Sequence, residues 1–591
     1  MANVFQIVFC VGLYVVLSAA QGPSVTTSYG EIRGVYGEVV YTNPAMITVH
    51  RYLGIPFANP PVGDLRFRKP ERLTMLKTPY NASAFGFTCP QLGDALPKTP
   101  LESQSEDCLF LNVVVPDRSP APDKDHAVMV FFYGGGFTTG SSTTYDAQFL
   151  AAYGNVIIVT ANYRVGPFGF MSTEDENCPG NFGLWDQQLA LQWVSSNIAS
   201  FGGDPKRVTI FGESAGAISC SYQAMYPPNR GLFQNVITQS GTFANTLSVP
   251  VPNARKYALR LANQLGCASD NTLHAMECLR KVAWKDLNDA LVLLGKTDPT
   301  FTMFSPAVDG DIVKGHPLQL LAMHQNKYME EVEFFRSLHY LNGVNQFEGA
   351  FMFPILGNPA AKNLEESLST FFYAIGVSPA RKALVAAVVH EYKNWNRPFN
   401  TQEVPLQTVR IFGDSTFGAS AVEALLMHEA GPANSYAYRF MPRPSVNIMG
   451  TPDWVPGANH ADELGFVFAL GMLLQQPWEV QMATHLVTYW SNFAKTGNPN
   501  TPSTPSVMWP VYNKVNMTYI ELDKDAVTAK HYFLAKEHHF WNNVMALNME
   551  SMDSNKCDIP VAAAASLMTS FVSKMVAGVA MLFAALLFKA F

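Results

Sequence analysis

The chain has 591 residues, of which 48% are hydrophobic and 15% are charged. This composition supports a large buried core and excludes a wholly disordered protein. The formal net charge is only -7 and no Lys/Arg-rich run occurs, which argues against nucleic acid as a partner.

The N-terminal segment Val4–Leu17 is apolar, and small residues separate it from Gln21. This pattern predicts a signal peptide over residues 1–20, although no Lys or Arg precedes the apolar run. The sequons at Asn81 and Asn516 are N-glycosylation acceptors in a secreted protein. We therefore expect an extracellular protein that is either secreted or held at the cell surface.

Near the C-terminus, Met575–Phe588 is an apolar run shorter than the roughly 20 residues of a membrane-spanning helix. Small residues at 562–566 and a short spacer precede it, which favours a GPI-attachment signal over residues 566–591, with a short membrane anchor as the alternative. Residues 549–565 are expected to form a stem. Cys557 in this stem either links two copies of the chain into a homodimer or remains an unlinked thiol.

Strand patterns and helical patterns alternate through most of the chain. Such alternation predicts an α/β protein with a large, mostly parallel central sheet flanked by helices. No repeat, linker or boundary appears before about Met549, so residues 21–548 are predicted to form one domain. The expected strands cover Ser24–Val40, Ile47–Phe57, Leu109–Val115, Ala127–Tyr133, Val156–Ala161, Val208–Phe211, Tyr340–Val344 and Tyr436–Phe440, and the expected helical segments cover Leu184–Ile198, Ala254–Leu294, Ala360–Leu426 and Val480–Thr496.

The stretch Val208–Ala217 carries the strongest chemical signal. It contains a G-x-S-x-G motif, Gly212 to Gly216, between an expected strand and the start of a helix, which is the context of a nucleophile elbow. Ser214 is therefore the candidate nucleophile. A serine hydroxyl also needs a base, an orienting acid and donors for the developing oxyanion.

Other segments offer these partners. Gly134–Gly136 directly follows an expected core strand, where its N–H groups could face the elbow, although a flexible glycine turn is the alternative. His460 lies in a polar loop and Glu348 follows an expected strand, positions that suit a base and an acid. Thirteen histidines compete for the role of base, and the residues alone favour a solvated histidine and a solvated glutamate at these two positions.

The chain resembles the cholinesterase/carboxylesterase family, the type-B α/β-hydrolases, from about Val25 to about Phe540. Beyond the elbow, the resemblance depends on eight further motifs, which together are highly specific. These are Tyr52–Ala58, Glu106–Asn112, Tyr133–Phe137, Asn162–Gly166, Gly180–Gln187, Phe201–Pro205, Gln239–Gly241 and Asn492–Pro499.

This resemblance implies the α/β-hydrolase fold with a small N-terminal β-sheet, and a serine esterase that uses no metal or other cofactor. It implies a triad of Ser214, Glu348 and His460, in the chain order that α/β-hydrolases use. The remaining implied features are an oxyanion hole from the N–H groups of Gly135, Gly136 and Ala215, a supporting role for Ser240 beside the acid, and the disulfides Cys89–Cys108 and Cys267–Cys278.

The chain departs from the cholinesterase pattern in the loop between Cys89 and Cys108. Cholinesterases carry a tryptophan there that holds the quaternary ammonium by cation–π attraction, whereas this loop contains no aromatic residue. Glu213 and Phe351 do match positions that line the pocket of the family, but other esterases share them. A general carboxylic ester is thus favoured over a choline ester as substrate.

Two cysteines, Cys178 and Cys220, stand where the family pattern needs none, and we expect them to form a disulfide with each other. The main alternative to an esterase is an adhesion protein of the neuroligin or neurotactin kind, which uses this fold without chemistry. Because such proteins typically lose triad residues and this chain keeps all three, the sequence favours the enzyme.

Overall fold

The computed structural model describes residues 22–545 apart from 40–46, 93–99, 118–124, 246–250, 252, 298–302, 317–319, 321–322, 324–327, 354–360, 369–370, 372–381, 448 and 470–473. The predicted signal peptide, the stem with Cys557 and the predicted anchor signal lie outside the described residues. Within this part of the chain, no helix is both long and apolar enough to span a membrane.

An eleven-stranded sheet organises the molecule, in the order β14-β13-β12-β11-β10-β9-β7-β8-β6-β4-β3, and a separate sheet has the order β1-β2-β5. In this spatial order, the neighbouring strands β8, β7, β9, β10, β11, β12 and β13 pair in parallel. The strand pairs at both edges of the sheet are antiparallel. The strands are β1 (Ser24–Thr27), β2 (Gly30–Arg33), β3 (Val35–Val39), β4 (Ile47–Pro56), β5 (Tyr80–Asn81), β6 (Phe110–Pro116), β7 (His126–Phe132), β8 (Ile157–Ala161), β9 (Gly203–Glu213), β10 (Asn235–Gln239), β11 (His339–Asn345), β12 (Ser435–Phe440), β13 (Tyr519–Leu522) and β14 (Val527–Lys530).

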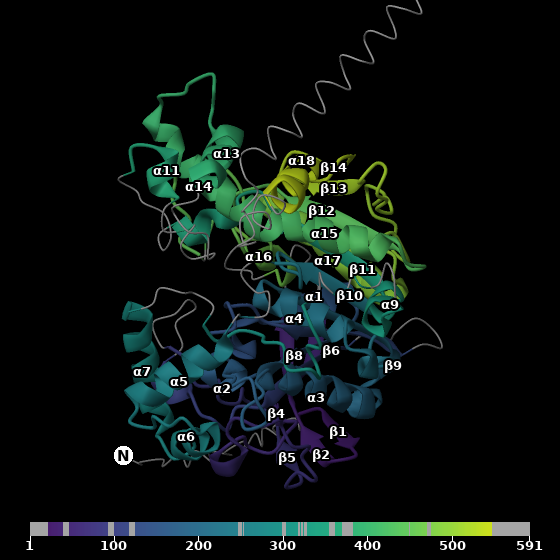
Figure 1. The fold of residues 1–591 in the computed structure, drawn as a ribbon. Helices are drawn as coiled ribbons and strands as arrows, with labels where there is room; N and C mark the ends of the chain where they lie inside the picture. The colour runs from purple at the N-terminus through teal and green to yellow at the C-terminus, as the bar shows by residue number, and fades with distance from the viewer. Residues whose placement is uncertain are drawn as a thin grey trace, which may run out of the picture.

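The central strands are rich in apolar residues because helices cover the sheet. Every residue of β7, β8 and β10 is buried, as expected for parallel strands packed on both faces. Figure 1 shows the sheet running from β13 and β14 at the upper end to β4 and the small sheet at the lower end. The architecture is that of an α/β-hydrolase fold with a small N-terminal sheet, as the sequence predicts.

Helices flank this sheet, and α4 packs against β9 and β10 while α17 packs against β7 and β9. The α-helices are α1 (Gln148–Gly154), α2 (Gly166–Phe170), α3 (Phe182–Asn197), α4 (Ala215–Ala224), α5 (Ala254–Gln264), α6 (Thr272–Leu279), α7 (Trp284–Thr297), α9 (Glu330–Arg336), α11 (Leu364–Ser367), α13 (Lys382–Tyr392), α14 (Val404–Gly413), α15 (Ala419–Glu429), α16 (Leu464–Val467), α17 (Pro477–Thr496) and α18 (Ala535–His538). Two π-helical segments, η8 (Asp414–Gly418) and η9 (His539–Met545), follow α14 and α18.

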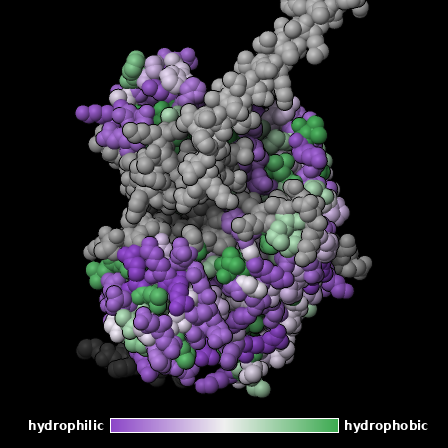
Figure 2. Space-filling model, viewed as in Figure 1, coloured by the Kyte–Doolittle hydropathy of each residue, from purple (hydrophilic) through white to green (hydrophobic). Residues whose placement is uncertain are grey.

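The described surface in Figure 2 is mostly hydrophilic, with hydrophobic residues lying singly or in small groups. Both sequon asparagines, Asn81 and Asn516, are exposed, as attachment of a sugar requires.

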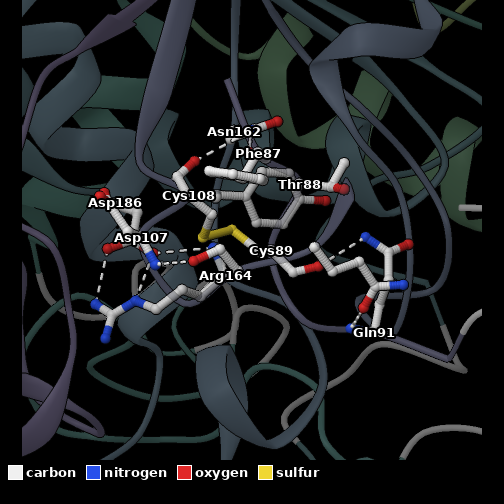
Figure 3. The surroundings of a disulfide bond; sticks show 12 residues. Phe87, Thr88, Cys89, Gln91, Asp107, Cys108, Asn162, Arg164 and Asp186 are labelled. Carbon is white, nitrogen blue, oxygen red and sulfur yellow. Dashed lines mark hydrogen bonds and ion pairs between the residues drawn. A yellow bond between two sulfur atoms is a disulfide. The ribbon is translucent and has the colours of Figure 1, made fainter. Parts of the chain in front are cut away.

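Two disulfides, Cys89–Cys108 and Cys267–Cys278, crosslink the described part of the chain. Around the first, the side-chain amide of Asn162 donates hydrogen bonds to the carbonyls of Phe87 and Cys108 (Figure 3). Arg164 and Asp186 form a buried bidentate ion pair beside it (Figure 3).

The expected disulfide between Cys178 and Cys220 is wrong, because both are free, buried thiols. The Cys178 thiol donates a hydrogen bond to the carbonyl of Met171, and Cys220 lies within α4. Both side chains pack in the hydrophobic core as reduced thiols.

Candidate active site

The turn between β9 and α4 places Ser214 in a strained conformation. Its φ is 54° and its ψ is -125°, which few non-glycine residues adopt. A Cβ on Gly216 would lie 1.9 Å from the carbonyl oxygen of Phe132, and one on Gly212 would lie 2.5 Å from the carbonyl carbon of Gly216. Only glycine fits at these two positions, which explains the G-x-S-x-G spacing.

The register of the parallel strands gathers distant residues at their carboxyl ends. Phe132 pairs with Gly212, so the Gly134–Gly136 turn lies beside the elbow. The Ser214 N–H donates to the carbonyl of Gln239 at 2.9 Å, and the Ser240 N–H donates to the carbonyl of Gly343 at 2.9 Å. Because β11 continues from Gly343 toward Glu348, four strand ends meet at one edge of the sheet.

The glycine turn touches the candidate nucleophile. A Cβ on Gly134 would lie 2.9 Å from the Cβ of Ser214 and 2.6 Å from Oε2 of Glu213. Gly135 and Gly136 have φ values of 113° and 59°, and the N–H groups of these two glycines and of Ala215 have no acceptor among the described residues. These N–H groups are free to donate to an oxygen placed between the turn and the elbow.

Glu348 begins the 3₁₀ turn η6 (Glu348–Met352), just after β11, and is only 3% exposed. Its Oε1 accepts hydrogen bonds from the Ser240 hydroxyl and from the Asn345 N–H, each at 2.5 Å. Its Oε2 lies 2.6 Å from Nδ1 of His460. Both carboxylate oxygens of Glu348 therefore have hydrogen-bond partners, and the residue is buried rather than solvated.

His460 lies in the loop between β12 and α16, and it is 3% exposed rather than on the surface. With Nδ1 on Glu348, its Nε2 lies 3.1 Å from Oε1 of Glu213. Nε2 has no hydrogen-bond partner in this conformation, so the imidazole is not bonded to the Ser214 hydroxyl. Hydrogen bonds between a base and a nucleophile are often long in unliganded enzymes and tighten around the substrate.

Burial and charge act on His460 in opposite directions. Burial favours the neutral ring, but the carboxylates of Glu213 and Glu348 outweigh it and raise the pKa of His460. Burial raises the pKa of Glu213, although the charged imidazole opposes this shift. The arrangement thus stabilises an imidazolium, the species that a general base becomes when it takes a proton.

Two aromatic rings confine the imidazole. Phe351 stacks on it with centroids 4.5 Å apart and planes at 20°, and Phe417 approaches at 4.5 Å and 36°. Because the two phenyl centroids are 6.2 Å apart, they contact His460 from directions nearly at right angles. Phe417 comes from the π-helical segment η8, and no sequence pattern identified it.

Sequence reasoning missed two more residues of the site, Asn459 and Glu463, both fully buried. Glu463 accepts hydrogen bonds from the side-chain amides of Gln239 and Asn345. Their position beside His460 in the sequence is the one signal that could have found them. Within the described residues, no group of three or more His, Cys, Asp or Glu side chains is arranged to hold a metal ion.

Comparison with known proteins places the chain among esterases and their relatives. It is 35% identical to the cholinesterase of Mus musculus over 545 residues, which cover 88% of this chain and 86% of that protein. It is 35% identical to the acetylcholinesterase of Bungarus fasciatus over 552 residues, 90% of this chain and 88% of that protein. Neuroligin-2 of Mus musculus is 34% identical over 565 residues, which cover 85% of this chain but only 65% of neuroligin-2.

The model of the family described as the carboxylesterase family matches residues 21–541, nearly the whole described chain. The chain belongs to the carboxylesterase family.

Proposed function

We propose that this protein is an extracellular serine carboxylic ester hydrolase in which Ser214 is the nucleophile, His460 the base and Glu348 the acid. The 2.6 Å contact between Glu348 and His460, buried beside a strained elbow serine, is the observation that carries the proposal. A buried carboxylate on Nδ1 fixes the tautomer whose Nε2 can accept a proton.

In the first half of the reaction, the Ser214 oxygen bonds to the ester carbonyl carbon while its proton passes to His460 Nε2. The carbonyl electrons move onto oxygen, where the N–H groups of Gly135, Gly136 and Ala215 hold the charge. Collapse of this intermediate breaks the bond to the alcohol, which leaves with the proton from His460. Water then attacks the acyl-enzyme by the same route and releases the carboxylic acid.

The ring must turn its Nε2 from Glu213 toward Ser214, or lose its proton, before it can act as the base. Glu213 then remains close enough to stabilise the imidazolium as it forms, because the carboxylate lies 3.1 Å from Nε2 in the resting state. Ser240 keeps the Glu348 carboxylate aimed at Nδ1 through its 2.5 Å hydrogen bond.

A general carboxylic ester suits the site better than a choline ester. The loop between Cys89 and Cys108 offers no aromatic face for a quaternary ammonium. Phe351, stacked on His460, and Phe417 place hydrocarbon surface beside the base, which suits the apolar part of an ester.

We place the protein at the cell surface or in the extracellular space, with residues 1–20 as signal peptide, 21–548 as the catalytic domain and a stem over 549–565. A lipid anchor added near residue 566 is the favoured attachment, and release of the protein from cells by a phosphatidylinositol-specific phospholipase tests it. Retention after this treatment would favour the short membrane anchor.

We also propose that Cys557 links two copies of the chain into a homodimer. A Cys557→Ser variant that runs as a monomer on non-reducing gels, beside a dimeric wild type, supports the disulfide-linked homodimer.

An adhesion role is the second candidate, favoured by the match to neuroligin-2. A panel of p-nitrophenyl esters of increasing acyl length, with acetylthiocholine beside them, separates the two. We expect turnover of uncharged esters by the purified ectodomain and loss of turnover in Ser214→Ala. An ectodomain without turnover on any ester would favour adhesion, and turnover that persists in Ser214→Ala would refute the assignment of the nucleophile.

A further inference from the structure

We propose that Asn459 is a positioning residue that ties the segment bearing the acid to the loop bearing the base. The expected kinetic effects rest on the proposed function, whereas the structural role of Asn459 rests on its hydrogen bonds alone. Asn459 precedes His460 in the chain and is fully buried.

One oxygen of Asn459 joins both partners of the triad. Its Oδ1 accepts a hydrogen bond from the His460 N–H at 2.7 Å and a second from the Phe351 N–H at 3.0 Å. Phe351 belongs to η6, the turn that Glu348 begins. A single side-chain carbonyl therefore holds the backbone of the base and the backbone of the acid-bearing turn at once.

The main chain of Asn459 strengthens this junction. Its carbonyl accepts from the side-chain amide of Asn345 at 2.7 Å, and Asn345 is the residue whose N–H donates to Glu348. Its N–H donates to Oδ2 of Asp462 at 2.7 Å. The residue beside it, Ala458, accepts from the Phe347 N–H at 2.8 Å, so the two segments run side by side.

The amide nitrogen fixes the orientation of this side chain. Nδ2 of Asn459 donates to the Thr451 hydroxyl at 2.8 Å. The carbonyl of Thr451 in turn accepts from the Arg443 guanidinium at 3.1 Å, and Arg443 also binds the carbonyls of Pro452 and Val455. With the donor committed to Thr451, Oδ1 can only face the two N–H groups.

The position thus requires a short side chain that accepts two hydrogen bonds and donates one. Asparagine meets this requirement. Alanine would leave the buried N–H group of His460 and the partly buried N–H group of Phe351 without this acceptor. The His460 and Glu348 loops would then be free to shift against each other, and their 2.6 Å contact would lengthen. Misplacement of catalytic groups by about 1 Å can cost about 100-fold in rate.

The test compares Asn459→Ala with Asn492→Ala in the full ectodomain. Asn492 is a matched control because it is also fully buried, and its side chain bonds Pro499 and Ser503 rather than the segments that carry Glu348 and His460. We expect both variants to lose thermal stability. Only Asn459→Ala should lose kcat, by roughly 10- to 100-fold with KM nearly unchanged, because the loss lies in positioning.

Two further variants keep the test decisive if alanine prevents folding. Asn459→Asp retains the acceptor for both N–H groups and should recover most of the lost kcat. Thr451→Val removes only the partner of Nδ2 and should lower kcat less than Asn459→Ala does. A kcat in Asn459→Asp no better than in Asn459→Ala would count against the hydrogen bonds to His460 and Phe351.

A second readout does not depend on ester hydrolysis. The short bond from His460 Nδ1 to Glu348 should give a low-field proton resonance that disappears in His460→Gln. We expect Asn459→Ala to shift or broaden this resonance and Asn492→Ala to leave it in place. An unchanged resonance in Asn459→Ala, with kcat equal to that of the control, would overturn the proposal. If the wild type hydrolyses no ester but Asn459→Ala still moves the resonance, the proposed function fails and the positioning role stands.

Discussion

Replacing Glu348 by Gln tests the triad at its most constrained point. The Oε1 side of Glu348 receives two donors, the Ser240 hydroxyl and the Asn345 N–H, and the Asn345 N–H cannot turn away because it is part of the backbone. The oxygen of the glutamine must therefore occupy this side. Its amide nitrogen then faces Nδ1 of His460 at the place where Oε2 now lies 2.6 Å away.

A nitrogen donor at this place reverses the tautomer of the ring. Nδ1 must become the acceptor, so the proton moves to Nε2, and Nε2 can no longer take the proton of Ser214. A comparable loss of the correct tautomer in a serine protease lowers kcat by about 10⁴-fold. We expect a fall of about that size here, because Glu213 beside Nε2 would further stabilise an Nε2–H group.

Steady-state hydrolysis of a p-nitrophenyl ester measures this loss, with thermal unfolding as the control for folding. Glu and Gln have nearly the same shape, so the unfolding temperature should change little. Ser240→Ala is the matched variant, since it removes one donor to Glu348 without changing the tautomer, and its kcat should fall far less. A Glu348→Gln enzyme that keeps kcat within about tenfold of the wild type would refute the proposed acid and the tautomer argument.

Three further predictions follow from other contacts. Removing the charge of Glu213 in Glu213→Gln should lower the pKa of His460, so the acid limb of the kcat/KM profile should move to lower pH by about one to three units; a limb that stays or moves up contradicts the role of this carboxylate. Burial raises the pKa of the Asp414 carboxyl to about 7, well above that of an exposed aspartate. The folded state therefore binds this proton more tightly than the unfolded state does, and stability should fall as pH rises from about 4 to about 7. In Asp414→Asn the unfolding temperature should no longer fall with pH over this range. The pH-dependent part of the free energy of unfolding that this carboxyl contributes is at most about 4 kcal/mol at neutral pH, and an unchanged slope in the variant would refute the prediction. Replacing both Cys89 and Cys108 by Ser opens a link across 19 residues and should cost about 3 kcal/mol, seen as a lower urea midpoint than in a Cys220→Ser control.

Much of the fold was predictable because periodicity and glycine spacing are local signals. The expected strand over Ala127–Tyr133 corresponds to β7, and the expected helix over Leu184–Ile198 corresponds to α3. The short strands β13 and β14 were not predicted, because their few residues carry no clear alternation and β14 is mostly exposed. The turn at Ser214 was predictable because only glycines fit on either side of it.

The site was harder to predict from the sequence, because its residues are distant in the chain and are brought together only by the register of the sheet. His460 and Glu348 looked like solvated residues, and the family resemblance singled them out. The approach of Glu213 to Nε2, the ring of Phe417 and the hydrogen bonds of Asn459 depend on tertiary packing and leave no pattern in the chain. The pairing of Cys178 with Cys220 failed for the same reason, since a count of cysteines says nothing about distance.

Covalent labelling tests the central claim most directly. A fluorophosphonate reacts with a serine only when a neighbouring base activates its hydroxyl, so the ectodomain should form one adduct, found by mass spectrometry on the peptide that contains Ser214. The adduct should disappear in Ser214→Ala and form far more slowly in His460→Gln. Stable ester hydrolysis without an adduct on Ser214, or an adduct that forms equally fast without His460, would contradict the account.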